Sequence, residues 1–160
     1  MTRPITYLTG DATTPTTPGP KLISHIVNDL GRWGRGFVTA LSRRWPEPER
    51  HYRRWHRDRS TNDFALGALQ LVTVEPSLQV ANMVAQHGIR TTGSATAPIR
   101  YDALDESLIR LATAATDLGA TVHMPRIGTG LAGGSWNRIE PLIISRLCEH
   151  DVAVTVYDLP

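Results

Sequence analysis

One glycine-rich segment constrains the fold more than any other part of the chain. It spans residues 124–134 and reads Met-Pro-Arg-Ile-Gly-Thr-Gly-Leu-Ala-Gly-Gly. A β-branched segment precedes it at residues 121–125, and an amphipathic segment follows it at residues 136–149. A strand, a glycine loop and a helix N-terminus in succession present free N–H groups to an anion. The segment therefore predicts an α/β fold with a phosphate-binding turn, and a tight turn that binds nothing is the alternative.

Strand and helix patterns alternate along the rest of the chain. Runs of β-branched or apolar residues predict strands, and apolar residues three and four apart predict helices. Strands are expected at residues 5–9, 22–28, 64–74, 78–85, 121–125 and 152–157, and helices at residues 37–45, 101–118 and 136–149 and after Pro46. This succession predicts one domain over residues 1–160, with three layers, α/β/α, around a mixed sheet of about six strands. Residues 87–98 are expected to form a long loop.

Composition limits the class of protein. Hydrophobic residues make up 41% and charged residues 20%, which suits a globular domain rather than a disordered chain. No apolar run reaches the roughly 20 residues of a membrane span, and residues 1–4 lack the apolar core of a signal peptide. The single cysteine, Cys148, excludes an internal disulfide, and no cluster has metal-ligand spacing. We expect a cytoplasmic monomer that uses no metal and no cofactor.

Arginine is unevenly distributed. Seven of the sixteen arginines lie between Arg43 and Arg59, beside Trp45, Tyr52 and Trp55. Such a mixture resembles a nucleic-acid-binding patch. Acidic residues dilute it, however, and no nucleic-acid motif accompanies it, so we favour a solvated helix whose aromatic side chains pack inward. Nucleic acid is therefore not an expected partner.

Three segments lie where predicted strands end, at residues 10–12, 25–36 and 124–134. Ligands of α/β sheets bind at the C-terminal ends of strands, so we expect one cleft there. In this order and spacing, the three segments resemble the macrodomain family of ADP-ribose binders. The pattern Met-Pro-Arg-Ile-Gly-x-Gly-Leu, followed by a tryptophan, is most similar to the branch that contains terminal ADP-ribose protein glycohydrolase. The resemblance implies ADP-ribose and ADP-ribosylated proteins as partners.

The resemblance also implies roles for single residues. Asp11 would accept a hydrogen bond from the adenine amino group and the Ala12 N–H would meet a ring nitrogen, although an aspartate here can equally hold a turn. Asn28 would face the distal ribose, unless it bonds to its own backbone. Arg126 would brace the second glycine loop. The other residues implied in ADP-ribose binding are Arg32, Gly34 and Gly36 in the first loop, Ile127, Gly128, Thr129, Gly130, Leu131 and Ala132 in the second loop, and Leu159 near adenine.

The chain departs from that branch at its catalytic residues. Glycohydrolases of the branch use a lysine after the fourth strand and an aspartate in the second glycine loop. Here the only lysine, Lys21, starts the second strand, and Ala132 replaces the aspartate. Gln86 and His87 lie near the lysine position. A covalent lysine intermediate is therefore not expected.

Three functions remain after this departure. We expect hydrolysis of ADP-ribose from glutamate or aspartate of modified proteins, because such an ester leaves more easily than an N- or O-alkyl glycoside. The candidate catalytic residues are Asn28, Gln86 and His87, which would position a water, and His87 would serve as general base unless it is a plain surface histidine. The alternatives are a reader that binds ADP-ribose without turnover and a phosphatase of ADP-ribose 1″-phosphate.

Overall fold

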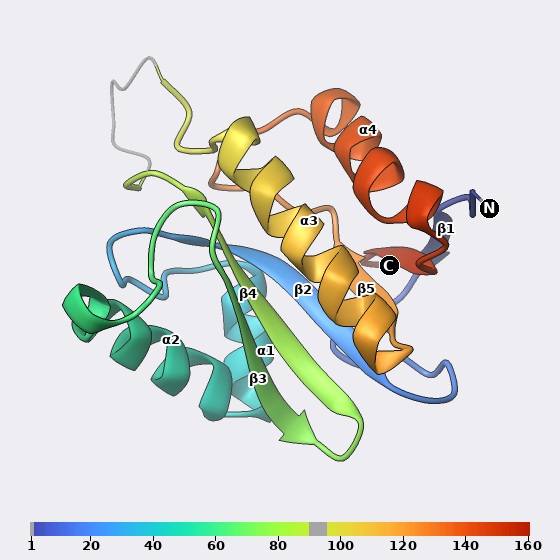
Figure 1. Ribbon diagram of the computed structural model, residues 1–160, viewed down its shortest axis with the longest axis horizontal. Helices are drawn as coiled ribbons and strands as arrows, with labels where there is room; N and C mark the ends of the chain where they lie inside the picture. The colour runs from blue at the N-terminus through green and yellow to red at the C-terminus, as the bar shows by residue number, and fades with distance from the viewer. Residues whose placement is uncertain (1, 90–95) are drawn as a thin grey trace.

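Six strands form one sheet in residues 2–89 and 96–160, the part of the chain that the computed structural model describes (Figure 1). They are β1 (Thr6–Thr9), β2 (Lys21–Asn28), β3 (Leu69–Glu75), β4 (Leu78–Gln86), β5 (Thr121–Pro125) and β6 (Val154–Asp158). Their order across the sheet is β1-β6-β5-β2-β4-β3. All neighbours are parallel except β3 and β4, which form an antiparallel hairpin. The predicted mixed sheet is confirmed.

Helices cover both faces of the sheet. Figure 1 shows α3 (Tyr101–Leu118) and α4 (Trp136–Arg146) in front of it, with α1 (Phe37–Arg44) behind and α2 (Glu47–Arg57) beside α1. Successive side chains of a strand point to opposite faces of the sheet, so one strand contributes to both hydrophobic cores. In β4, Ala81 and Met83 pack in the cluster with α3 and α4, whereas Val80 and Val84 pack in the cluster with α1 and α2. The three predicted layers are therefore confirmed. No described helix is long and apolar enough to cross a membrane.

The aromatic residues of the arginine-rich segment belong to the second core. Trp45, Tyr52 and Trp55 are all buried, as predicted. The indole N–H of Trp45 donates to Glu75 and that of Trp55 donates to Asp63. Their rings are therefore unable to stack on bases, whereas the arginines of this segment are exposed together with Pro46 and Asp58.

Several predicted boundaries are wrong. The third strand begins at Leu69 rather than at residue 64, because Phe64 packs edge-on against Trp55, with ring centroids 4.9 Å apart, and Gly67 has a φ of +92°. The last helix ends at Arg146 rather than at residue 149 and is followed by a short turn, Cys148–His150. The last strand begins at Val154 rather than at residue 152. Residues 90–95 of the predicted 87–98 loop lie outside the described residues.

Candidate functional site

The C-terminal ends of five parallel strands meet at one edge of the sheet. β2 aligns with both β4 and β5, and β6 lies between β5 and β1, all in the same direction. The segments after them are therefore neighbours, and they include the three that the sequence selects at residues 10–12, 25–36 and 124–134. Lys21 lies at the other end of β2, where its Nζ donates to the Gly19 carbonyl at 2.8 Å.

Two adjoining cavities occupy this edge. The first, of about 320 Å³, lies against residues 125–132, and the second, of about 330 Å³, lies against Asn28, Trp33 and Gly34. The residues common to both are Ile26, Arg35, Val38, Gln86 and Leu131. Among the described residues that line either cavity there is no Asp or Glu. Because they share a wall and carry no carboxylate, the two cavities form one cleft suited to an anion.

Residues of the second glycine loop line the first cavity. Within the loop, the N–H groups of Ile127, Thr129, Gly133 and Gly134 donate to the carbonyls of Pro125, Arg126, Gly130 and Gly128, respectively. Within the described part of the chain, no acceptor is bonded to the backbone N–H groups of Gly128, Gly130, Leu131 and Ala132. Successive unpaired N–H groups in a turn form an anion-binding concavity. This loop therefore has the geometry of a phosphate site.

Arg126 anchors that loop to the last strand. Its Nε and an Nη atom donate to the two oxygens of Asp158 at 2.7 and 3.0 Å. Its guanidinium also lies between two rings, 5.1 Å from the centroid of Tyr7 and 5.3 Å from that of Trp136. These contacts join the second glycine loop to β6, and the bracing role of Arg126 stays a prediction.

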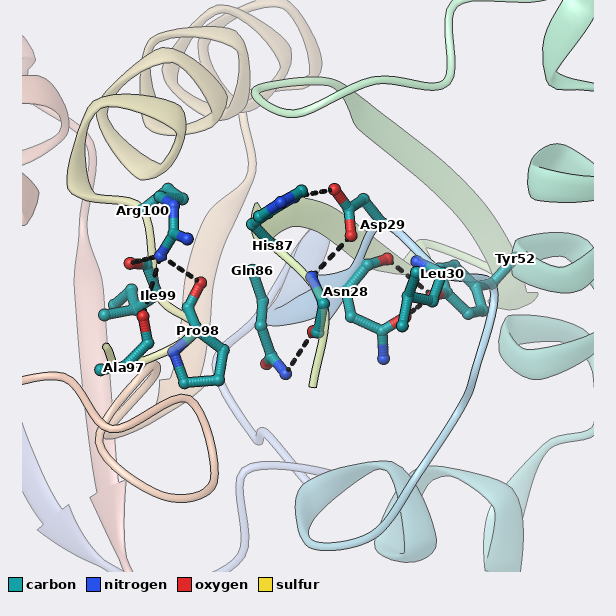
Figure 2. A network of polar contacts seen from close by, with 11 residues as sticks. Asn28, Asp29, Leu30, Tyr52, Gln86, His87, Ala97, Pro98, Ile99 and Arg100 are labelled. Atoms are coloured by element: carbon teal, nitrogen blue, oxygen red, sulfur yellow. Dashed lines mark hydrogen bonds and ion pairs between the residues drawn. The ribbon is translucent and has the colours of Figure 1, made fainter. Parts of the chain in front are cut away.

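Asn28 holds the first loop, as Figure 2 shows. Its Oδ1 accepts hydrogen bonds from the Leu30 N–H at 2.9 Å, the Arg32 N–H at 3.3 Å and the Tyr52 hydroxyl at 2.8 Å. Its Nδ2 donates to the Arg32 carbonyl at 2.6 Å. The amide therefore bonds to its own loop, the alternative noted from the sequence, although Asn28 also lines the second cavity.

Gln86 and His87 point in different directions at the end of β4 (Figure 2). Gln86 lines both cavities, and its Nε2 donates to the Gly88 carbonyl at 3.1 Å. His87 lines neither; its side chain is 60% exposed, and its Nδ1 lies 2.6 Å from Asp29 Oδ2. Successive residues of an extended chain alternate in direction, so only one of the two can face the cleft. Of the candidate catalytic side chains, Gln86 is the best placed.

Asp11 holds a turn after β1. Its Oδ1 accepts from the N–H and the hydroxyl of Thr13 at 2.8 and 2.7 Å, and its Oδ2 lies 3.6 Å from a guanidinium nitrogen of Arg44. Burial raises the pKa of Asp11, but these hydrogen bonds and the Arg44 charge outweigh burial and hold the pKa below its usual value. The next residue, Ala12, is buried, and its N–H has no acceptor among the described residues. The carboxylate thus stays ionised beside an available N–H.

The remaining predicted residues divide by position. Gly34 and Gly36 line the cavities, as do Ile127 through Ala132. Arg32 lines neither cavity, and Leu159 is 80% exposed beyond β6. Two ionisable residues that line the cleft were not among the predicted site residues. One is Arg35. The other is His25, which is buried under the first cavity beside Asn82, and burial lowers its pKa to about 4. A histidine within an apolar strand was the available signal for the latter.

Solved structures cover almost the whole chain. A macrodomain protein from Streptomyces coelicolor is 55% identical and covers 97% of this chain and 99% of its own, with a TM-score of 0.86. A protein of unknown function from Bacteroides thetaiotaomicron is 51% identical and covers 98% of both chains, with a TM-score of 0.92. Thermosipho africanus DarTG, solved in complex with ADP-ribose, is 16% identical over 88% of this chain and 38% of its own; its TM-score of 0.67 shows a shared fold.

Curated proteins are also similar to this chain. Chromodomain-helicase-DNA-binding protein 1-like of Mus musculus is 34% identical over 98% of this chain, which spans only 18% of that protein's length. An ADP-ribose 1″-phosphate phosphatase of Lodderomyces elongisporus is 26% identical over 96% of this chain and 99% of its own. No family model matches the chain. Because the Streptomyces macrodomain protein is matched at 55% identity along 99% of its length, this chain belongs to the macrodomain family.

Proposed function

We propose that the cleft binds ADP-ribose, with the diphosphate between the two glycine loops. The observation that carries this proposal is the set of unpaired backbone N–H groups at Gly128, Gly130, Leu131 and Ala132, residues that line a cavity without carboxylates. Adenine would lie toward Asp11 and the Ala12 N–H, and the distal ribose would lie toward Gln86. The complex of ADP-ribose with a protein of the same fold supports the choice of ligand.

We further propose that the protein hydrolyses ADP-ribose esters of glutamate or aspartate side chains. A water would form a bond to C1″ as the bond from C1″ to the ester oxygen breaks. The carboxylate leaves with the electron pair, and the proton of the attacking water passes to solvent. Gln86 is suited to orient this water, because it lines both cavities and its Oε1 has no donor among the described residues. Catalysis would rest on positioning and on donors around the developing charge.

This reaction would differ from that of the terminal ADP-ribose protein glycohydrolase branch, to which we assign the chain on its Met-Pro-Arg-Ile-Gly-x-Gly-Leu pattern. Lys21 lies at the far end of β2, and Ala132 carries no carboxylate. Neither covalent attack by a lysine nor resolution by an aspartate is therefore available. We also propose that the protein is a cytoplasmic monomer and that its reaction requires no metal.

A second candidate is the removal of phosphate from ADP-ribose 1″-phosphate. It is favoured by the similarity to a phosphatase of that name along 99% of the relative's length. The same cleft would hold the substrate, and the reacting atom would be phosphorus instead of C1″. A reader that binds without turnover is the outcome in which neither reaction occurs.

The test measures three quantities on one sample: ADP-ribose binding by calorimetry, release of ADP-ribose from glutamate-modified protein, and phosphate release from ADP-ribose 1″-phosphate. We expect Gln86→Ala to lower turnover by about tenfold or more while binding is kept. Gln79→Ala, the same change at the other end of β4, is the matched control.

Each result has a definite meaning. Ester cleavage that depends on Gln86 supports the glycohydrolase, whereas cleavage that is unchanged in Gln86→Ala removes Gln86 from the mechanism. Binding without either reaction identifies a reader. Absence of ADP-ribose binding by the unmodified protein would refute the whole proposal.

A further inference from the structure

Arg35 lies at the boundary between the two cavities of the cleft and lines both. It is flanked by Gly34 and Gly36, whose φ values are +79° and +87°. This left-handed backbone is one that side-chain-bearing residues rarely adopt. The two glycines therefore fix a sharp turn, and Arg35, the residue between them, lines the cleft.

Three other arginines near the cleft are bonded to the protein. Arg126 forms two hydrogen bonds with Asp158, and Arg44 donates to the Thr13 hydroxyl. Arg100 donates to three backbone carbonyls, those of residues 97–99, as Figure 2 shows. In contrast, the Arg35 side chain forms no hydrogen bond or ion pair within residues 2–89 and 96–160, and it is exposed. Arg35 therefore has no bracing role among the residues described.

The surroundings of Arg35 favour an anion. No carboxylate lines either cavity in the described structure, so no side chain there competes for the guanidinium. The same first cavity is lined by Gly128, Gly130 and Leu131, whose backbone N–H groups are unpaired among the described residues. A guanidinium offers five donors in a planar fork that matches two oxygens of one phosphoryl group. An anion in this cavity would thus receive donors from the guanidinium and from the backbone.

We propose that Arg35 binds a phosphoryl group of the ligand and determines the affinity of the cleft. This inference rests on the proposed function and adds to it a residue to which the sequence analysis gave no role, whereas Arg32, which it did name, lines neither cavity. The phosphoryl group belongs either to the diphosphate, next to the first cavity, or to a phosphate on C1″, next to the second. Arg35 reaches both positions because it lines both cavities.

The experiment titrates the full chain by calorimetry with three probes: ADP-ribose, ADP-ribose 1″-phosphate and inorganic pyrophosphate. It compares the unmodified protein with Arg35→Gln and with Arg54→Gln. Arg54 is exposed on α2, outside the cleft. Arg54→Gln therefore removes the same positive charge from the protein but not from the cleft. Each titration is repeated at about 50 mM and about 500 mM salt, because exposed charges are screened at high salt.

We expect Arg35→Gln to weaken binding by about tenfold or more at low salt, the effect of one charge-assisted hydrogen bond. Arg54→Gln should bind as the unmodified protein does, and the loss in Arg35→Gln should shrink at high salt. Equal losses for ADP-ribose and ADP-ribose 1″-phosphate assign Arg35 to the diphosphate. A loss confined to ADP-ribose 1″-phosphate assigns it to the phosphate on C1″.

Other outcomes separate this inference from the function it rests on. If Arg35→Gln binds all three probes within about twofold of the unmodified protein, Arg35 is not a ligand residue and the inference is overturned. If the unmodified protein binds pyrophosphate through Arg35 but does not bind ADP-ribose, the proposed function fails and the inference stands. If none of the probes binds, both are overturned.

Discussion

The two glycine loops of the cleft need glycine for different reasons. At Gly34 and Gly36 the φ is positive, but apart from chain neighbours nothing lies within 4 Å of the place where a Cβ would be. At Gly128 the φ is also positive, and a Cβ would lie 2.8 Å from Ile99 Cδ1. A Cβ on Gly134 would lie 2.6 Å from the Gly128 carbonyl oxygen. The first loop therefore needs glycine for its conformation alone, whereas the second also needs it for close packing on the core.

The anchors of the two loops differ as well. Asn28, which holds the first loop, is buried and forms neutral hydrogen bonds. Arg126 and Asp158, which hold the second loop, form an ion pair whose side chains are 39% and 45% exposed. Buried neutral bonds are insensitive to salt, and exposed ion pairs are screened by it. Changes in salt and pH should thus affect the two loops differently, although both line the same cleft.

The largest effect should follow Gly130→Glu, which tests whether the second loop binds the anion. Gly130 does not have a positive φ, so a residue with a side chain fits its backbone. Apart from its chain neighbours, no atom lies within 4 Å of the place where a Cβ would be, so the variant should keep the fold. The added carboxylate would enter the first cavity and repel a diphosphate. We expect affinity for ADP-ribose to fall by about a hundredfold or more, with an unchanged Tm. A variant that folds and still binds would remove this loop from the site.

Gly128→Ala should have the next largest effect, on stability. The new Cβ meets Ile99, Ile139 and Ile26 at 2.8–3.1 Å in a left-handed backbone. We expect a loss of about 3 kcal/mol in the free energy of unfolding, measured with urea. Gly36→Ala, with a positive φ but open space, is the matched control and should lose about 1–2 kcal/mol. Equal losses in the two variants would abolish the distinction between the loops.

The smallest effect should follow Asp158→Asn, which tests the ion pair. Hydrogen bonds from Arg126 hold the pKa of Asp158 below its usual value. A carboxylate whose pKa is lowered by folding adds stability above its unfolded pKa of about 3.9, and this stability is lost as the pH falls through the folded pKa. We expect a slightly lower Tm for the variant at pH 7, with the difference vanishing in strong acid and shrinking in 1 M salt, a concentration at which screening acts over about 3 Å.

Asp117→Asn is the control for this measurement, since Asp117 is an exposed carboxylate on α3. If the difference in Tm between Asp158→Asn and the unmodified protein is the same in low and high salt, the ion pair of Arg126 with Asp158 does not hold the loop by electrostatic attraction.

Much of the fold could be predicted because local patterns agree with the tertiary structure. The helix Tyr101–Leu118 ends at Gly119, which has the left-handed conformation of a C-cap. The strand Thr121–Pro125 matches its prediction at both ends. The prediction of one cleft follows from a general property of parallel sheets, whose strand ends gather at one edge. The bounds of the helix and the strand depend on residues close together in the sequence, and the position of the cleft follows once the strands are known to be parallel.

What could not be predicted depends on direction and on distant contacts. Sequence cannot show that Gln86 rather than His87 faces the cleft, since that depends on how β4 leaves the sheet beside Asp29. Nor does it distinguish Arg32 from Arg35, because the choice depends on the turn made by Gly34 and Gly36. The start of β3 was missed because Phe64, a good strand residue, packs instead against the aromatic residues of α2.

The pairing of β1 with β6 places the first and last strands side by side, with Thr6 opposite Thr155. This pairing closes nearly the whole chain into a loop, a long-range contact of the kind that slows folding. The cleft is coupled to that closure through Arg126, which joins the second glycine loop to Asp158 of β6. A ligand that binds only the folded protein would add about 2.7 kcal/mol to global stability when its concentration is 100 times Kd. Thermal denaturation with and without ligand would then report on binding and on completion of folding at once.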